Sequence, residues 1–210
     1  MVETIYAQLP ADFQNAISTT AGVVLSDFDP SGSNTAEAIQ TSVLFATSGG
    51  VNVSCKYTFK DYGSDIDNCP KNTKELLDVE SVECMLSGTG VTITSEAAKS
   101  MLGLADKSTE ISLDTVTPRI NVKTSDFADL WYVCPYGTQG GFVAIKLSNA
   151  LSDGGLSMQS TDLEKGKFAF SYKGYSSINA PTVVPFTFYL KATDASKTMN
   201  VKAAPAPVKK

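Results

Sequence analysis

The sequence contains no histidine among its 210 residues. This absence excludes serine and cysteine nucleophiles that an imidazole would activate, and it excludes every metal site with a histidine ligand. Two carboxylates could still act as acid and base in a small hydrolase, although scattered Asp and Glu side chains are usually a solvated surface. The sequence favours a protein that is not an enzyme and holds no cofactor or metal, with a carboxylate hydrolase as an alternative.

Positive charge is also scarce, since 17 Lys and Arg stand against 22 Asp and Glu, for a net charge of -5. Tight binding of nucleic acid requires clustered cations that displace phosphate counterions. An acidic surface would suit a path that DNA passes without sticking, because like charges repel over roughly 8 to 10 Å. On its own, an acidic balance usually serves solubility.

Long apolar runs are absent as well, so no segment reaches the ~18 residues that a membrane helix needs. The amino-terminal residues show no secretory signal, which predicts folding in the cytoplasm, where thiols stay reduced. The spacing of Cys55, Cys69, Cys84 and Cys134 fits no zinc pattern. We expect four small buried side chains that form no disulfide.

Short apolar segments separated by Gly, Pro, Asp, Asn and Ser are typical of strands joined by turns. Residues 51–61 alternate Val51, Val53 and Cys55 with polar neighbours, which predicts a half-buried strand. Segment 82–94 alternates in the same way. Further strands are predicted over 22–28, 43–46, 110–116, 130–135, 141–147, 156–161, 167–175 and 183–192, whereas 31–37 reads as a polar connection.

The clearest helix is predicted over 95–104, with Ser95 or Thr94 as its cap and Ala97, Met101 and Leu104 on one face. The predicted organisation is an N-terminal arm (1–20), one β-domain (21–192) and a C-terminal tail (193–210). Trp131 and Tyr132 stand in an alternating strand and are expected in the core rather than on a sugar-binding surface.

Residues 62–79 form a polar segment too long for an ordinary hairpin loop, and loops of that length usually have a function. Asp61, Asp65 and Asp67 could suggest calcium, but Pro70 and Leu76 stand where an EF-hand needs Gly and Glu. Local Asx turns are the stronger interpretation. We expect this loop to contact a neighbouring subunit or ring through Tyr62, Asp65, Asp67, Asn68, Pro70, Lys74 and Glu75.

Several segments, taken in their order and spacing, resemble the major tail tube proteins of long-tailed (siphovirus-like) phages and prophages of Gram-positive bacteria. They are AGVVLSDFDP (21–30), LFATSGGVNVS (44–54), DYGSDIDNCPKNTKEL (61–76), DLWYVCPYG (129–137), GGFVAIKLSNALSDGGLSMQSTDLEKGKFAFSYKGY (140–175) and VPFTFYLKA (184–192).

The resemblance implies a mainly β subunit, a two-sheet sandwich or barrel-like tail tube fold with one short flanking helix and a long inter-strand loop. It also implies hexameric rings that stack head to tail into the tail tube of a virion assembled in the host cytoplasm. Its partners would be further copies of the chain, the tape measure, tail terminator and distal tail proteins, and double-stranded DNA passing without specific binding. No membrane partner is implied.

The predicted strands at 51–61, 82–94, 156–161 and 167–175 would then form the sheet that faces the lumen. Small polar groups on their outer faces offer DNA few cationic anchors: Asn52, Ser54, Thr58, Glu83, Ser157, Gln159, Thr161 and Ser171. Lys56, Lys60, Lys167 and Lys173 fall on the same faces. Either they lie near the ring rims beside acidic residues, or the lumen faces the other side.

A rival reading from another class is a secreted or surface β-sandwich that binds carbohydrate or serves as an adhesin. It would explain the β-rich pattern and the aromatic residues. The missing signal peptide and four cysteines without a pairing scheme count against it.

Overall fold

The structure, a computed structural model, describes residues 22–32, 34–136, 141–160, 162 and 166–191. It is mainly β, which confirms the predicted fold class. The predicted N-terminal arm (1–20) and C-terminal tail (193–210), together with Thr161, lie outside the described residues. None of the described helices is long and apolar enough to cross a membrane.

The strands follow one another along the chain with two α-helices and two 3-10 helices between them. In chain order the elements are β1 (Val23–Leu25), α1 (Ala36–Ser42), β2 (Val43–Phe45), β3 (Thr47–Asp61), η2 (Tyr62–Asp65), β4 (Leu77–Gly90), α2 (Ser95–Leu102), β5 (Ala105–Glu110), β6 (Leu113–Pro118), η3 (Thr124–Asp126), β7 (Ala128–Tyr136), β8 (Gly141–Ser152), β9 (Ser157–Gln159), β10 (Lys167–Gly174) and β11 (Phe186–Lys191).

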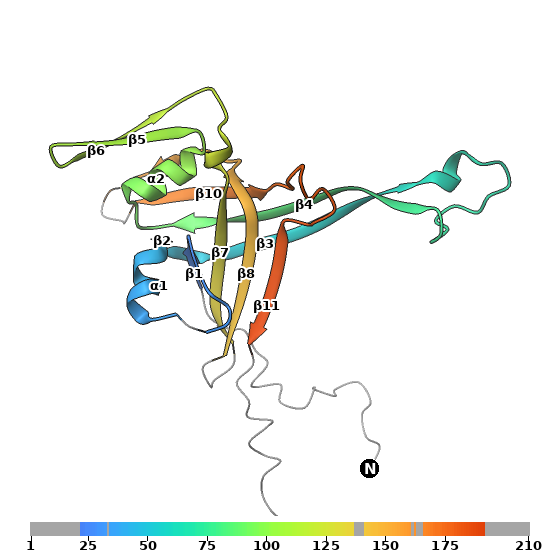
Figure 1. The fold of residues 1–210 in the computed structure, drawn as a ribbon, viewed down its shortest axis with the longest axis horizontal. Helices are drawn as coiled ribbons and strands as arrows, with labels where there is room; N and C mark the ends of the chain where they lie inside the picture. Colours follow the sequence, from blue (N-terminus) through green and yellow to red (C-terminus); the bar gives the residue numbers. More distant parts are fainter. Residues whose placement is uncertain (1–21, 33, 137–140, 161, 163–165, 192–210) are drawn as a thin grey trace, which may run out of the picture.

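Within the described residues, every strand except β5 and β6 belongs to one antiparallel sheet that has two halves. One half has the order β2-β1-β7-β8-β11, and the other contains β3, β4, β10 and β9. The end of β8 joins the halves, because Ala150 to Ser152 pair with β10. In Figure 1, strands β3, β4 and β10 run across the direction of β7, β8 and β11.

The main core lies between these two halves. Val24, Phe45 and Leu147 from the first half meet Leu86 and Phe170 from the second. The rings of Phe45 and Phe170 have centroids 4.6 Å apart. Each such side chain, fully buried, contributes roughly 1.5–3 kcal/mol to stability. The two halves of the sheet therefore pack face to face, as in the predicted β-sandwich.

Helix α2 packs against this core through Ala97 and Met101, both fully buried. Thr94 is the cap, since its Oγ1 accepts a hydrogen bond of 3.1 Å from the backbone N–H of Ala97. The helix ends before the predicted Leu104 because Gly103 adopts a left-handed φ of 71°.

Helix α1 was not predicted, because its segment has only one apolar residue, Ile39, large enough to contact the core. Thr35 caps it by accepting a hydrogen bond from Ala38 N. Ile39 packs on a second cluster that contains Leu25 and Trp131. Trp131 is buried, as expected, but on the face of the sheet that looks away from the main core.

Other sequence predictions also need correction. Strand β4 begins at Leu77 and ends at Gly90, rather than spanning 82–94, so the loop before it is shorter than 62–79. The strand predicted over 110–116 starts too early: residues 111 and 112 form the turn of the β5–β6 hairpin, and the strand itself is β6, from Leu113 to Pro118. Only Cys84 and Cys134 are buried, while Cys55 and Cys69 are half-buried.

Candidate assembly surfaces

A two-stranded arm projects from the body of the molecule (Figure 1). Strand β4 pairs with β10 only from Met85 to Gly90. From Cys55↔Cys84 outward to Asp61↔Leu77, β3 and β4 pair with each other alone among the described residues. We call residues 55–84 the arm.

One face of the arm is apolar, because it continues the core-facing side of β3 and β4 beyond the core. Tyr57, opposite Val82, is followed on this face by Phe59, which is opposite Val79. Phe59 is 53% exposed and Val79 is 46% exposed. The rings of Tyr57 and Phe59 stack with centroids 6.2 Å apart. The outer part of this face, at Phe59 and Val79, therefore stays about half exposed within the described structure.

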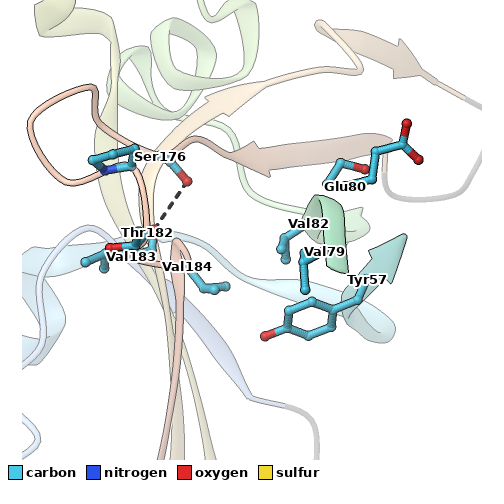
Figure 2. A pocket seen from close by; sticks show the side chains of 10 residues that line it. Tyr57, Val79, Glu80, Val82, Ser176, Thr182, Val183 and Val184 are labelled. Carbon is cyan, nitrogen blue, oxygen red and sulfur yellow. Dashed lines mark hydrogen bonds between the residues drawn. The ribbon is translucent and has the colours of Figure 1, made fainter. Parts of the chain in front are cut away.

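A groove of about 420 Å³ lies between the root of the arm and the loop that precedes β11. Its arm side includes Tyr57, Val79 and Val82, and its other side includes Val183 and Val184, as Figure 2 shows. A hydrogen bond of 3.2 Å from Ser176 Oγ to the carbonyl oxygen of Val183 fixes that loop. Sequence reasoning missed this groove because its walls are far apart in the chain.

The opposite, polar face of the arm continues across β4 and β10. Asn52 is paired with Ser87, and Ser87 with Ser171. Register and strand alternation put the residues predicted to face the lumen on this one face, with Thr161 outside the described residues: Asn52, Ser54, Thr58, Glu83, Ser157, Gln159 and Ser171.

Two of the lysines on this face have identifiable partners. Lys173 Nζ lies 2.9 Å from Glu83 Oε1, and this hydrogen bond, with the charge of Lys173, holds the pKa of Glu83 below its ordinary value. Lys56 is directly opposite Glu83 in the β3–β4 register and lowers the same pKa further. Lys56 and Lys173 therefore lie beside Glu83, an acidic residue, whereas the position of these lysines near the ring rims stays a prediction.

The loop at the tip of the arm runs from Tyr62 to Leu76 and is organised by Asp61. Asp61 Oδ1 accepts a hydrogen bond of 2.8 Å from Gly63 N, and Oδ2 accepts one of 2.8 Å from Asn72 N. The predicted Asx turn is therefore present. All of the residues predicted to contact a neighbour are exposed on this loop: Tyr62, Asp65, Asp67, Asn68, Pro70, Lys74 and Glu75.

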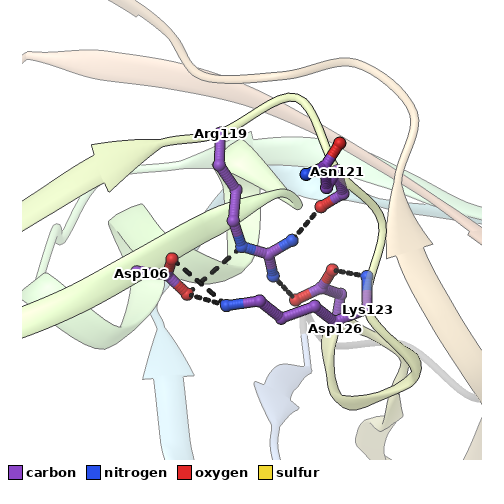
Figure 3. A network of polar contacts seen from close by, with 5 residues as sticks. All are labelled: Asp106, Arg119, Asn121, Lys123 and Asp126. Carbon is purple, nitrogen blue, oxygen red and sulfur yellow. Dashed lines mark hydrogen bonds and ion pairs between the residues drawn. The ribbon is translucent and has the colours of Figure 1, made fainter.

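The β5–β6 hairpin is a second projection, and polar contacts fasten it to the body. Arg119 bridges Asp106 and Asp126, and Lys123 Nζ lies 2.9 Å from Asp106 Oδ1, as Figure 3 shows. The side chain of Asp126 is only 4% exposed. Burial opposes its ionisation, but the Lys123 backbone N–H and the Arg119 guanidinium outweigh it and lower the pKa of Asp126.

The other end of this hairpin is tied to helix α2. Asp114 accepts hydrogen bonds from Ser95 Oγ at 2.5 Å and from Thr109 Oγ1 at 2.6 Å. These hydroxyls, together with Lys107, hold the pKa of Asp114 well below its usual range. Lys107 also lies 2.9 Å from Glu96 of α2.

No family model matches this chain, and no curated protein matches it. Among solved structures, it is similar to a chain in the virion of a native gene transfer agent particle and to one in the tail of an empty gene transfer agent particle with C6 symmetry. Each alignment has 9% identity and a TM-score of 0.42, and covers 87% of this chain and 99% of the other.

Proposed function

We propose that this protein is the major tail tube subunit of a long-tailed phage or prophage, which assembles into stacked hexameric rings in the virion tail. The observation that carries the proposal is the arm, a projecting ribbon with an uncovered apolar face. Exposed apolar patches on a folded protein mark interaction sites, because water contact with them costs free energy. In an assembly of identical subunits, a neighbouring copy of the protein would bury the apolar face of the arm.

The outer edge of β3 supports the same proposal. Strand β3 is 15 residues long and lies at the end of its sheet, so its outer backbone groups lack a strand partner among the described residues. An open edge of this length is a template for pairing with another chain. A closed ring of copies in which each sheet continues into the next leaves no edge open, whereas head-to-tail stacking of rings extends without limit.

The polar face of β3, β4, β9 and β10 is proposed as the wall of the lumen that conducts DNA. Hydroxyl and amide groups outnumber the four lysines on this face, Lys56, Lys60, Lys167 and Lys173, and Glu83 balances the charge of Lys173. Phosphates passing this wall therefore meet mostly uncharged groups. The tape measure, tail terminator and distal tail proteins are the further partners that the sequence resemblance implies, and no catalytic role is proposed.

Replacing loop residues 62–76 by a short Asn-Gly turn tests the role of the arm. The variant should fold with an unchanged circular dichroism spectrum but form neither rings nor tubes in negative-stain microscopy and sedimentation. The parent protein at the same concentration should form both. Tubes from the variant, or a monomeric parent with affinity for glycans, would contradict the proposal.

Changing Ser54, Ser157 and Ser171 to Lys tests the lumen. Tubes should still assemble, and they should retain double-stranded DNA at low salt that the parent tubes release, because each added cation can exchange a counterion. The matched control carries Lys at Thr187, an exposed residue of β11 on the far half of the sheet. The lumen assignment fails if the control retains as much DNA as the triple variant.

A further inference from the structure

Cys55 and Cys84 lie directly opposite each other at the root of the arm. Their Sγ atoms are 3.1 Å apart. Directly paired residues of antiparallel strands have Cα atoms about 4.5 or 5.5 Å apart, within the roughly 4.4–6.8 Å that a disulfide spans. The sulfur atoms need to approach by only about 1 Å to reach a bond length of about 2.05 Å.

We propose that Cys55 and Cys84 are a disulfide-forming site that a small-molecule disulfide oxidises, and that the resulting bond locks the root of the arm. The inference is independent of self-assembly, because it rests on two side chains of one subunit. Both cysteines are thiols in the structure.

The chemistry proceeds by two thiol–disulfide exchanges. The half-buried Cys55 loses its proton to water, and its thiolate attacks oxidised glutathione, forming a mixed disulfide and releasing one glutathione thiolate. Cys84, after losing its proton, attacks Cys55 Sγ and displaces the second glutathione. Two protein thiols are oxidised to one disulfide, and one molecule of oxidised glutathione is reduced to two of the thiol.

The burial of the two thiols indicates which of them reacts first with the oxidant. Cys84 is fully buried, and burial together with the neighbouring Cys55 thiol raises the pKa of Cys84. Cys55 therefore meets the oxidant first, and Cys84 acts as the resolving thiol. Cys69 lies in the tip loop and Cys134 lies on β7, so neither is opposite this pair in the sheet.

A bond at this position closes a loop that contains the whole arm, from Cys55 to Cys84. With this crosslink in place, β3 and β4 could no longer separate at the root of the arm. The crosslink therefore restricts the open states of the β3–β4 ribbon. The lock stiffens the arm while leaving its exposed apolar face unchanged.

The test is incubation of the purified full chain with oxidised glutathione under native conditions, alkylation of remaining thiols, and peptide mapping without reduction. The expected result is a crosslink between the peptides that contain Cys55 and Cys84. Amide exchange in the arm should slow by about tenfold or more, because the crosslink restricts the open states from which exchange occurs. Cys55→Ser, treated in the same way, should show neither change.

Persistence of glutathione on Cys55 with an alkylated Cys84 would overturn the proposed site, as would two alkylated thiols. A crosslink without slower exchange in the arm would overturn the lock. A Cys69→Ser variant is the control for the cysteine of the tip loop. It should form the crosslink between Cys55 and Cys84 at the same rate as the parent.

Discussion

The two projecting hairpins of this protein are held in opposite ways. The β5–β6 hairpin is fastened to its own subunit by Arg119, Asp126 and Asp114, whose charged groups have partners within a few ångströms. The arm is joined to the body at its root, where Lys173 of β10 pairs with Glu83 and Cys84 is buried in the core. Beyond this root, among the described residues, the arm is held by the pairing of its two strands and by its own tip loop. It presents Phe59 and Val79 to solvent.

This difference predicts that the β5–β6 hairpin serves the fold and that the arm contacts another molecule. Ion pairs and hydrogen bonds complete the β5–β6 hairpin within the monomer. The apolar face of the arm remains incomplete, because burying aromatic and aliphatic side chains is favourable and no described residue buries these. Changes in the first hairpin should therefore affect stability, and changes on the apolar face should affect assembly.

The largest expected effect comes from Phe59→Asp on the apolar face of the arm. Assembly should be lost, because a charge would replace the ring at the proposed contact, while the midpoint of thermal unfolding should move by no more than about 2 °C, as for other surface substitutions. Sedimentation and calorimetry measure the two effects. Thr58→Asp, on the polar face of the same strand, should assemble normally, and equal loss in both variants would contradict the comparison.

The next effect in size is expected from Arg119→Ala in the β5–β6 network. The substitution leaves the carboxylate of Asp126 poorly solvated and without its guanidinium partner, so the unfolding temperature should fall. Amide exchange should speed up in β5 and β6 but not in the arm. Arg119→Lys should recover only part of the stability, since an ammonium cannot bridge two carboxylates with a fork. Unchanged exchange in β5 and β6 would show that the network does not fasten the hairpin.

Acid should loosen the β5–β6 hairpin more than the arm. The pKa values of Asp106, Asp114 and Asp126 are lowered in the folded state, whereas an unfolded Asp titrates near ~3.9. Near that pH the unfolded state binds more protons than the native state. The contribution of these three ionised aspartates to the free energy of unfolding is therefore present above about pH 5 and is lost as the pH falls through their folded pKa values. Unfolding temperatures between pH 6 and 3 measure it, and Asp114→Asn should flatten the slope. A parent whose stability does not fall with acid would refute this.

The smallest effect is expected from Asp61→Ala at the base of the tip loop. Loss of the hydrogen bonds from Gly63 and Asn72 should cost ~1 kcal/mol locally, as for other caps, with little change in global stability. Amide exchange of residues 62–76 should increase. Asp65→Ala, an exposed aspartate of the same loop, is the control, and identical exchange in both variants would remove Asp61 from its proposed role.

The sequence predicted those elements whose pattern is local. The alternation from Val51 to Asp61 is the signature of a strand with one apolar face, and β3 has it along the arm. Helix α2 was predictable from its cap and its apolar stripe. The same alternation predicted the grouping of Asn52, Ser54 and Ser171 on one face, although only the register shows that they are neighbours in the sheet.

The rest depends on signals that the sequence does not carry. The β5–β6 turn has Ile111 and Ser112 at φ values of 43° and 67°, where hairpins normally use Asn or Gly, so no turn signal marks it. The groove beside the arm is lined by Tyr57 and Val183, which are far apart in the chain. The pairing of Cys55 with Cys84 depends on the β3–β4 register, which shifts at irregularities between Ser48 and Val51 and between Thr58 and Phe59. These contacts join residues that are distant in the sequence. The composition of the chain and the spacing of its residues therefore do not determine them.

The most direct measurement of the central claim is a three-dimensional electron microscopy reconstruction of the particles that the purified protein forms. The account predicts rings in which the apolar face of the arm, with Phe59 and Val79, is buried against a neighbouring copy, and in which Ser54 and Ser171 face the central channel. A reconstruction that leaves Phe59 and Val79 in solvent, or that places these serines on the outer wall, would contradict it.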